Sequence, residues 1–348
     1  MNKQIKQLLE NLFDDYDDLI QNDDNIGKYS IGKKIYDEDI KKKVKEWLHY
    51  NIASSPENNN IDRNLTFEYI DDILYCNLHF NDYMTVFMSE IPDYVKINKI
   101  TCKNIKFNSL YNLPKEIDGT MFIVSYNHTK LIGNFPEKIG CLKIQNSKIK
   151  SLEGLNDNCV SIESLEIETC NNFQYFMGIP EKVGRISIQE CNKLQNLIGL
   201  PESVDDIELT DLRKFSSLEG CPKELKGDLR ITDCKKLLSL KYISSLIIGD
   251  CSVTYTGIEH LDMAESKTRI IGDFNVSNNK LVDLSNGPED VRGNYDCAYN
   301  PKLTCLNAQD TFMSGYKKTF YCTKNRRLKT LQGLPMMIKG DIIINTDL

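Results

Sequence analysis

Apolar residues recur at a nearly constant interval from about residue 120 onward. If one apolar position per repeat is taken as an anchor, most intervals between successive anchors are 21 to 25 residues; the anchors are Ile123, Ile144, Ile167, Ile188, Leu209, Ile231, Ile248, Val276, Cys297, Cys322 and Ile344. An apolar or aromatic residue stands two positions before every anchor. Because alternate residues of a strand point to the same face, each repeat predicts one short β-strand. A period of this length indicates a solenoid.

A second position, three residues after the anchor, is Cys or Asn in seven repeats: Cys170, Cys191, Cys234, Cys251, Asn279, Asn300 and Asn325. An Asn there can bond to backbone groups of neighbouring turns, and a Cys can pack as a small apolar residue. The better copies close on Leu-x-x-Leu-x-Gly-Leu-Pro, as in residues 194–201 and 328–335. Proline fixes φ and lacks an N–H, so it favours extended segments on the convex side.

The repeat is irregular around Ile248, where the intervals before and after the anchor are 17 and 28 residues. The pattern predicts a disturbed register over residues 249–272. Within it, residues 258–263 are expected to form a helical turn that projects from the solenoid, either as a binding feature or through sequence drift.

These repeats resemble the short, proline-containing leucine-rich repeats of bacterial effectors and, more closely, those of the repeat proteins of large tailed bacteriophages. Two segments carry the resemblance, Ser217-Leu218-Glu219-Gly220-Cys221-Pro222 and Gly272-Asp273-Phe274-Asn275-Val276-Ser277-Asn278-Asn279. The expected fold is an α/β-type repeat solenoid, a leucine-rich-repeat horseshoe with a parallel concave sheet and mostly extended convex segments. Such repeats serve many partners, so the resemblance specifies fold far more than function.

A different pattern precedes the repeats. Residues 2–20 have apolar positions at helical spacing and predict an amphipathic helix, and a second helix is expected from about Asp37 to Tyr50. A polar stretch around Asn58–Asn60 places a domain boundary, which divides the chain into an acidic helical segment, 1–64, and the solenoid, 65–348. Residues 73–80 and 83–88 flank Asn81-Asp82 and predict a β-hairpin that caps the first repeat, at about 70–90.

Charge is distributed unevenly along the chain. Residues 1–90 hold 10 Lys and Arg against 18 Asp and Glu, net −8, and the remaining residues hold 33 against 32, net +1. Neither part has the basic excess that a nucleic-acid binder normally shows. No apolar run is long enough to span a membrane and the first residues do not form a secretory signal, so we expect a cytoplasmic protein, in the host cytoplasm if viral. Its twelve cysteines are then expected to be reduced.

Catalytic and cofactor motifs are missing from the sequence. There is no phosphate-binding glycine loop, nucleophile elbow or Cys-x-x-Cys pair, and the four histidines lie far apart. We therefore expect no enzyme activity, no metal and no cofactor.

The surface expected to carry function is the concave strand face, where carboxylates outnumber basic residues. Its candidate partner-binding residues are Lys143, Gln145, Glu166, Glu168, Arg185, Gln189, Asp206, Glu208, Asp228 and Arg230. Solenoids offer extended surfaces of this kind to other proteins. The leading hypothesis is a non-enzymatic module that binds a host or virion protein; the alternatives are a structural component of a phage particle and an enzyme hidden in residues 1–64. The strand at 341–345 is expected to offer an edge for self-association or for a partner strand.

Overall fold

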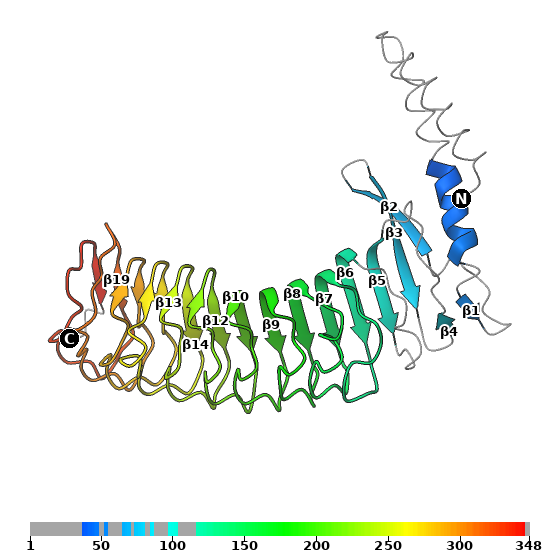
Figure 1. Cartoon of the computed structure of the whole chain (residues 1–348). Coiled ribbons are helices and arrows are strands. Elements are labelled where there is room, and N and C mark those ends of the chain that lie inside the picture. The colour runs from blue at the N-terminus through cyan, green and yellow to red at the C-terminus, as the bar shows by residue number, and fades with distance from the viewer. Residues whose placement is uncertain are drawn as a thin grey trace, which may run out of the picture.

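The computed structural model describes residues 37–48, 52–54, 65–70, 73–80, 84–86, 97–103 and 116–344. They form an elongated parallel β-solenoid with one helix, over residues 37–48, at its N-terminal end (Figure 1). This helix agrees with the expectation from sequence, and its apolar residues Val44, Trp47 and Leu48 are buried. The helix expected over 2–20 and the polar stretch around Asn58 lie outside the described residues.

The first strands of the solenoid are long and continuous. They are β2 (Leu65–Ile70), β3 (Ile73–Phe80), β5 (Ile97–Lys103), β6 (Glu116–Val124), β7 (Lys138–Gln145), β8 (Ser161–Glu168), β9 (Lys182–Gln189) and β10 (Ser203–Thr210). Only the β2–β3 pair is antiparallel; from β3 onward each strand pairs in parallel with the next. One turn of the solenoid thus contributes one strand to the sheet.

After β10 the strand of each of the next four turns is split into two short pieces, and in the last two turns, those of β19 and β20, the first piece is reduced to isolated bridges at Phe312 and Met336. The first pieces are β11 (Glu224–Leu225), β13 (Leu246–Ile247), β15 (Arg269–Ile270) and β17 (Asp290–Val291). The second pieces are β12 (Leu229–Thr232), β14 (Cys251–Thr254), β16 (Phe274–Asn275), β18 (Tyr295–Asp296), β19 (Phe320–Cys322) and β20 (Ile342–Ile344). Both rows stay parallel and in register, so the stack continues without a shift.

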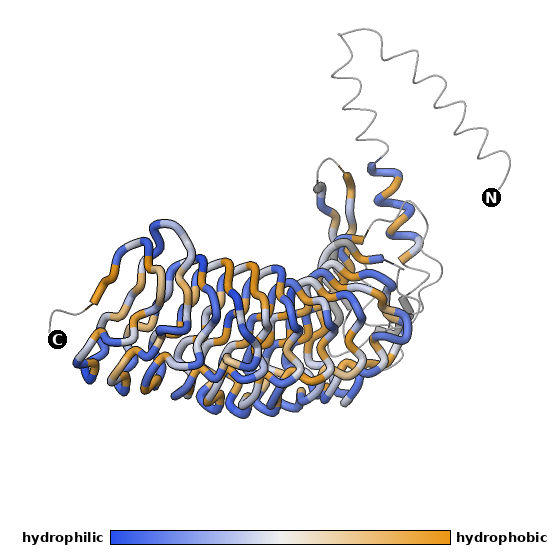
Figure 2. Tube along the Cα trace, turned by 60° about the vertical axis from the view of Figure 1, so that its left-hand side comes forward, coloured by the Kyte–Doolittle hydropathy of each residue, from blue (hydrophilic) through white to orange (hydrophobic). Residues whose placement is uncertain are grey.

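The core is built from the alternate strand positions that the sequence pattern marks. The anchors Ile144, Ile167 and Ile188 are at most 1% exposed, and so are the residues two positions before them. Hydrophobic segments recur in this way turn after turn along the stack (Figure 2). No helix occurs between the strands within residues 116–344, where the connections are turns and extended segments.

The anchor predicted at Ile248 is wrong, and its correction removes the irregularity. Ile248 is 48% exposed, whereas Val253 is buried and pairs with the preceding anchor Ile231. With Val253 as the anchor, the intervals of 17 and 28 residues become 22 and 23. The anchor was misplaced because residues 246–248 are three consecutive apolar residues and so resemble a strand position. Cys251, two positions before the true anchor, is only weakly apolar and does not mark the strand clearly.

The segment 249–272 is therefore an ordinary turn. Ile258, Leu261 and Met263 are fully buried, so no helical turn projects from the solenoid there. The same correction moves Cys251 from the position three after the anchor into the row of core residues two before it. Thr256 takes its place in the former row.

In each of the ten turns from β6 to β19 the chain forms a left-handed backbone corner two residues after the anchor. The φ angles there lie between 50° and 61°, and none of the ten residues is glycine: Ser125, Asn146, Thr169, Glu190, Asp211, Asp233, Tyr255, Asn278, Tyr299 and Lys324. This conformation costs about 1 kcal/mol for a residue with a Cβ. A backbone bond to the next turn offsets the cost; for example, the N–H of Asn146 donates to the carbonyl of Glu168 at 3.1 Å.

The N-terminal hairpin differs from the predicted one. Strand β3 pairs with β2, which precedes it, and Met84–Val86 forms β4, which pairs with β1 (Ile52–Ser54). The chain therefore reverses between β2 and β3 rather than at Asn81-Asp82. The helix lies against this hairpin, where the hydroxyl of Tyr69 donates to Asp37 Oδ2 at 2.8 Å.

Candidate partner-binding face

Nine of the ten candidate residues lie in β7, β8, β9, β10 and β12, and Asp228 stands directly before β12. All ten share the open face of the sheet. Strand register aligns them in rows, because equivalent residues of successive strands are direct partners: Lys143 with Glu166, and Gln145 with Glu168 and then Gln189. None of the ten is buried. We call three outward rows of β7–β20 the open face: the residues three and one positions before the buried anchor and one position after it. The alternation of strand residues predicts this arrangement, and the structure has it.

Ion pairs connect the charged side chains of this face. Lys143 Nζ lies 3.3 Å from carboxylate oxygens of both Glu166 and Glu168, and an Arg185 guanidinium nitrogen lies 2.5 Å from Glu208. Partial burial lowers the pKa of Lys143, but hydrogen bonds to the two glutamates outweigh this effect and raise the pKa above its ordinary value. Lys143 therefore stays charged at neutral pH.

Two of the candidate carboxylates hold the backbone of the next turn. Asp206 Oδ1 accepts a hydrogen bond from the backbone N–H of Asp228 at 2.7 Å, and Asp228 Oδ1 accepts one from Asp250 at 2.6 Å. The series continues through Asp273 to Asn294. We call Asp206, Asp228, Asp250 and Asp273 the carboxylate array. Its members bridge the gap that opens where the strands are split, so Asp206 and Asp228 have a structural role besides any role in binding.

A glycine beside each later carboxylate makes this geometry feasible. Gly227, Gly249 and Gly272 stand directly before array residues, and a Cβ on Gly249 would lie only 2.2 Å from Asp228 Oδ1. The recurring Gly-Asp pair is therefore a steric requirement of the split strand. The Gly-Asp pair is therefore the sequence signal that identifies the array. An analysis of apolar positions alone does not detect it.

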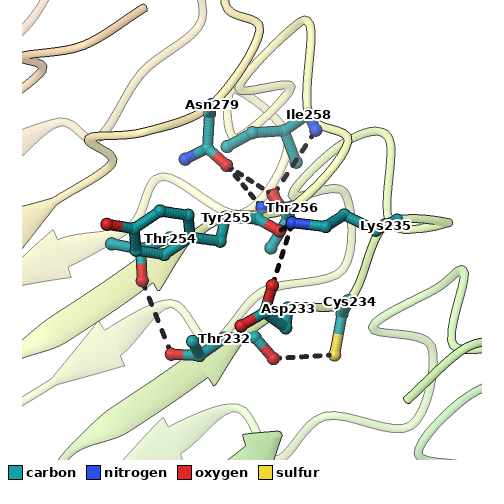
Figure 3. A network of polar contacts seen from close by, with 9 residues as sticks. All are labelled: Thr232, Asp233, Cys234, Lys235, Thr254, Tyr255, Thr256, Ile258 and Asn279. Atoms are coloured by element: carbon teal, nitrogen blue, oxygen red, sulfur yellow. Dashed lines mark hydrogen bonds and ion pairs between the residues drawn. The ribbon is translucent and has the colours of Figure 1, made fainter. Parts of the chain in front are cut away.

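A second set of polar side chains lies buried behind the left-handed corners. Asn279 Oδ1 accepts hydrogen bonds from both the backbone N–H and the hydroxyl of Thr256, each at 2.8 Å (Figure 3). In the same way Ser147 Oγ accepts from Tyr126, and Asn325 Oδ1 accepts from the N–H of Asn300. We call Ser147, Thr256, Asn279, Asn300 and Asn325 the buried polar array. It bonds each turn to the turn before it, whereas the carboxylate array bonds each turn to the turn after it.

The cysteines of the described residues are free thiols, and most are buried. Burial raises the pKa of the Cys234 thiol to about 12, and that of Cys159 to about 12 as well. A thiol that stays protonated and out of solvent is a poor nucleophile. Cys159 and Cys234 therefore act as packing groups.

Neither a metal cluster nor a membrane span is found in the described chain. No group of three or more His, Cys, Asp or Glu side chains is arranged to hold a metal ion within these residues. No helix among them is both long and apolar enough to cross a bilayer.

Sequence reasoning missed two groups of residues on this molecule. The continuation of the carboxylate array was one of them: the misplaced anchor at Ile248 hid Asp250, and Asp273 stands before β16 rather than in it. A set of basic residues in the last turns, described below, is spread over loops where strand alternation gives no signal. Searches of protein-family models, curated proteins and solved structures find no match to this chain.

Proposed function

We propose that the solenoid is a protein-binding module whose open face receives a basic surface of its partner. The observation that carries the proposal is the charge of this face. From β7 to β20 its outward positions hold nine carboxylates, Glu166, Glu168, Asp206, Glu208, Asp228, Asp250, Asp273, Asp296 and Asp341, against three basic residues, Lys143, Arg185 and Arg230. The resulting net charge is −6, and none of these side chains is buried.

This charge distribution favours a protein over a nucleic acid. Carboxylates repel a phosphate backbone, which binds through Lys and Arg. Strands stacked about 4.8 Å apart repeat the negative charge along the whole stack. Such a field attracts a basic partner during encounter and raises the association rate more than the final affinity.

We further propose that the turns belong to the leucine-rich-repeat type, as the sequence resemblance implies. Three features support this assignment: one parallel strand per turn of about 22 residues, the buried Asn three residues after the anchor, and helix-free connections that contain buried prolines such as Pro222. In this arrangement the strand side is the surface most often offered to a partner.

The experiment compares two triple variants of matched charge. One replaces Glu166, Glu168 and Glu208 on the open face by Gln, and the control replaces the exposed Glu153, Glu202 and Glu219, which lie outside the strands. Proteins captured by the tagged wild-type chain are compared quantitatively by mass spectrometry, and the best partner is purified for kinetics.

The open-face variant should associate about tenfold more slowly, with a weaker dependence on salt, while the control keeps the wild-type rate. Thermal unfolding should be similar in both variants, because exposed ion pairs contribute little to stability. Equal association rates for both triple variants would refute the open face as the binding site.

A further inference from the structure

The last described turn of the solenoid carries an unusual concentration of positive charge. Residues 312–344 contain seven basic residues and one acidic residue, net +6; the basic ones are Lys317, Lys318, Lys324, Arg326, Arg327, Lys329 and Lys339. None of the seven forms an ion pair with another described residue. Elsewhere in the solenoid, basic residues such as Lys143, Arg185 and Lys302 are paired.

Apolar side chains are exposed on the same turn. Ile342 is 42% exposed, although the equivalent Phe274, Tyr295 and Phe320 of the preceding strands are fully buried. Met336, Met337 and Ile343 of the same turn are also exposed. We call residues 323–344, with Lys317 and Lys318 at their border, the C-terminal face. A ligand for this surface has to combine negative charge with apolar side chains.

The sequence of this chain contains a segment with those properties. Residues 7–24 hold seven carboxylates and no basic residue, and their apolar positions follow helical spacing. The acidic residues are Glu10, Asp14, Asp15, Asp17, Asp18, Asp23 and Asp24. We propose that the C-terminal face binds residues 7–24 of a second copy of the chain, so that copies associate head to tail.

A single chain cannot place the whole of residues 7–24 on its own C-terminal face, because Asp24 cannot reach that face. Asp37 is fixed beside β2 through Tyr69, at the opposite end of the stack from β20 (Figure 1). Fourteen strands from β2 to β20 make 13 intervals of about 4.8 Å, or about 62 Å. The 13 residue steps from Asp24 to Asp37 span at most about 45 Å when fully extended.

Head-to-tail contact joins two different surfaces and therefore leaves one of each free in every dimer. Such heterologous association continues into longer assemblies unless the geometry closes a ring. The attraction is electrostatic in part, so it weakens as salt screens the charges. This inference does not rest on the proposed role of the open face, because the two experiments change different residues and concern different partners.

The experiment measures the mass of the full-length protein by sedimentation velocity over a range of concentrations, at low and high ionic strength. One variant carries K324E, R326E and R327E on the C-terminal face. Its matched control carries K182E, K223E and K236E, three exposed lysines elsewhere on the solenoid. A third variant carries D14K, D15K, D17K and D18K, and a fourth combines these four changes with K324E, R326E and R327E.

The wild-type and control proteins should grow in mass with concentration at low salt. The reversal on either side alone should weaken association about tenfold or more, and the combined reversal should restore it. Three results would overturn the proposal: a wild-type protein that stays monomeric at every concentration, association that neither reversal changes, or a monomer that binds anionic phosphatidylserine vesicles or RNA through the same three basic residues.

Discussion

Tyr295 carries a hydroxyl without a hydrogen-bond partner inside the core of the described chain. Its ring stacks between Phe274 and Phe320, with ring centroids 4.9 and 5.3 Å away. Burial raises the pKa of Tyr295 well above its ordinary value, so the phenol remains neutral. On folding, its hydroxyl loses the hydrogen bonds that it makes to water and gains none within the described chain. The ring of Tyr295 packs tilted against Phe274 and edge-on against Phe320, and its hydroxyl adds no stabilising contact.

Replacing Tyr295 by Phe should therefore stabilise the protein. Removing an unsatisfied buried hydroxyl gains about 1 kcal/mol in the free energy of unfolding, because the desolvation cost of that group disappears. Chemical denaturation measures the change, with Tyr299→Phe at an exposed position as the control. A loss of stability in Tyr295→Phe would show that the hydroxyl has a partner.

The buried thiols make the stability of the fold sensitive to alkaline pH. Burial raises the pKa of Cys76, Cys159 and Cys234 to about 12, whereas an unfolded thiol titrates near 9. The folded state thus holds these protons more tightly than the unfolded state. Their contribution to stability is fully present below about pH 9 and is lost as the pH rises toward 12.

The free energy of unfolding should accordingly fall between pH 9 and 11, by up to about 1.4 kcal/mol per pH unit for each such thiol. Cys234→Val removes one such thiol and should reduce the slope below that of the wild type. Urea unfolding at a series of pH values gives both slopes. Identical slopes for Cys234→Val and the wild type would contradict the burial argument.

At the scale of the strand, the Gly-Asp pair decides where the sheet is split. Gly249→Ala would place a Cβ 2.2 Å from Asp228 Oδ1 and 2.5 Å from the backbone of Gly227. Movement of the Asp228 side chain cannot relieve the clash with the backbone. We expect a loss of at least about 2 kcal/mol. Gly287→Ala is the control, because its nearest contact is a Leu261 methyl group at 3.2 Å. Calorimetry of the two variants should separate them clearly; similar melting temperatures would mean that the array adapts easily.

The strands of the solenoid were predictable because burial imposes a period of two on the residues of each turn. The register error at Ile248 arose where this signal is ambiguous, since Leu246 and Ile247 already belong to the preceding short strand and Cys251 is only weakly apolar. A search for Gly-Asp would have found Gly249-Asp250 at the same position as Gly227-Asp228. The partner of β3 was missed for a related reason: β2 alternates as a strand should, but it stands beside the expected domain boundary.

The residues of the candidate face were predictable wherever the strands were, but the bonds that their side chains form were not. Alternation alone puts Glu166 and Glu208 on the outside. It does not reveal that Asp206 and Asp228 bond to the backbone of the next turn, because that depends on where each strand breaks. Nor does it mark the basic residues of the last turns, such as Lys324 and Lys339, because they lie outside the strands.

For the whole molecule, stability is a sum over neighbouring turns, because a turn contacts only those next to it. The same substitution should therefore have different effects along the stack. Ile186→Ala, at a fully buried position, should cost about 3 kcal/mol and separate the unfolding of the two halves, whereas Ile342→Ala, at the equivalent but 42% exposed position, should cost much less. Hydrogen exchange read by mass spectrometry reports both effects, and equal costs would speak against an exposed last turn.

The two polar arrays also have a genetic consequence. They bond in opposite directions, and in the turns of β14, β16 and β18, where both occur, successive turns meet through the same pair of connections. Excision of residues 228–249 would join Gly227 to Asp250 and restore the Gly-Asp junction at the point of deletion. We expect this shorter chain to fold with an unchanged β-type circular dichroism spectrum and a cooperative melt. Unequal recombination can therefore remove or add whole repeats in such a gene. The number of turns then changes, while the sequence at each new junction is the Gly-Asp pair already present in other turns.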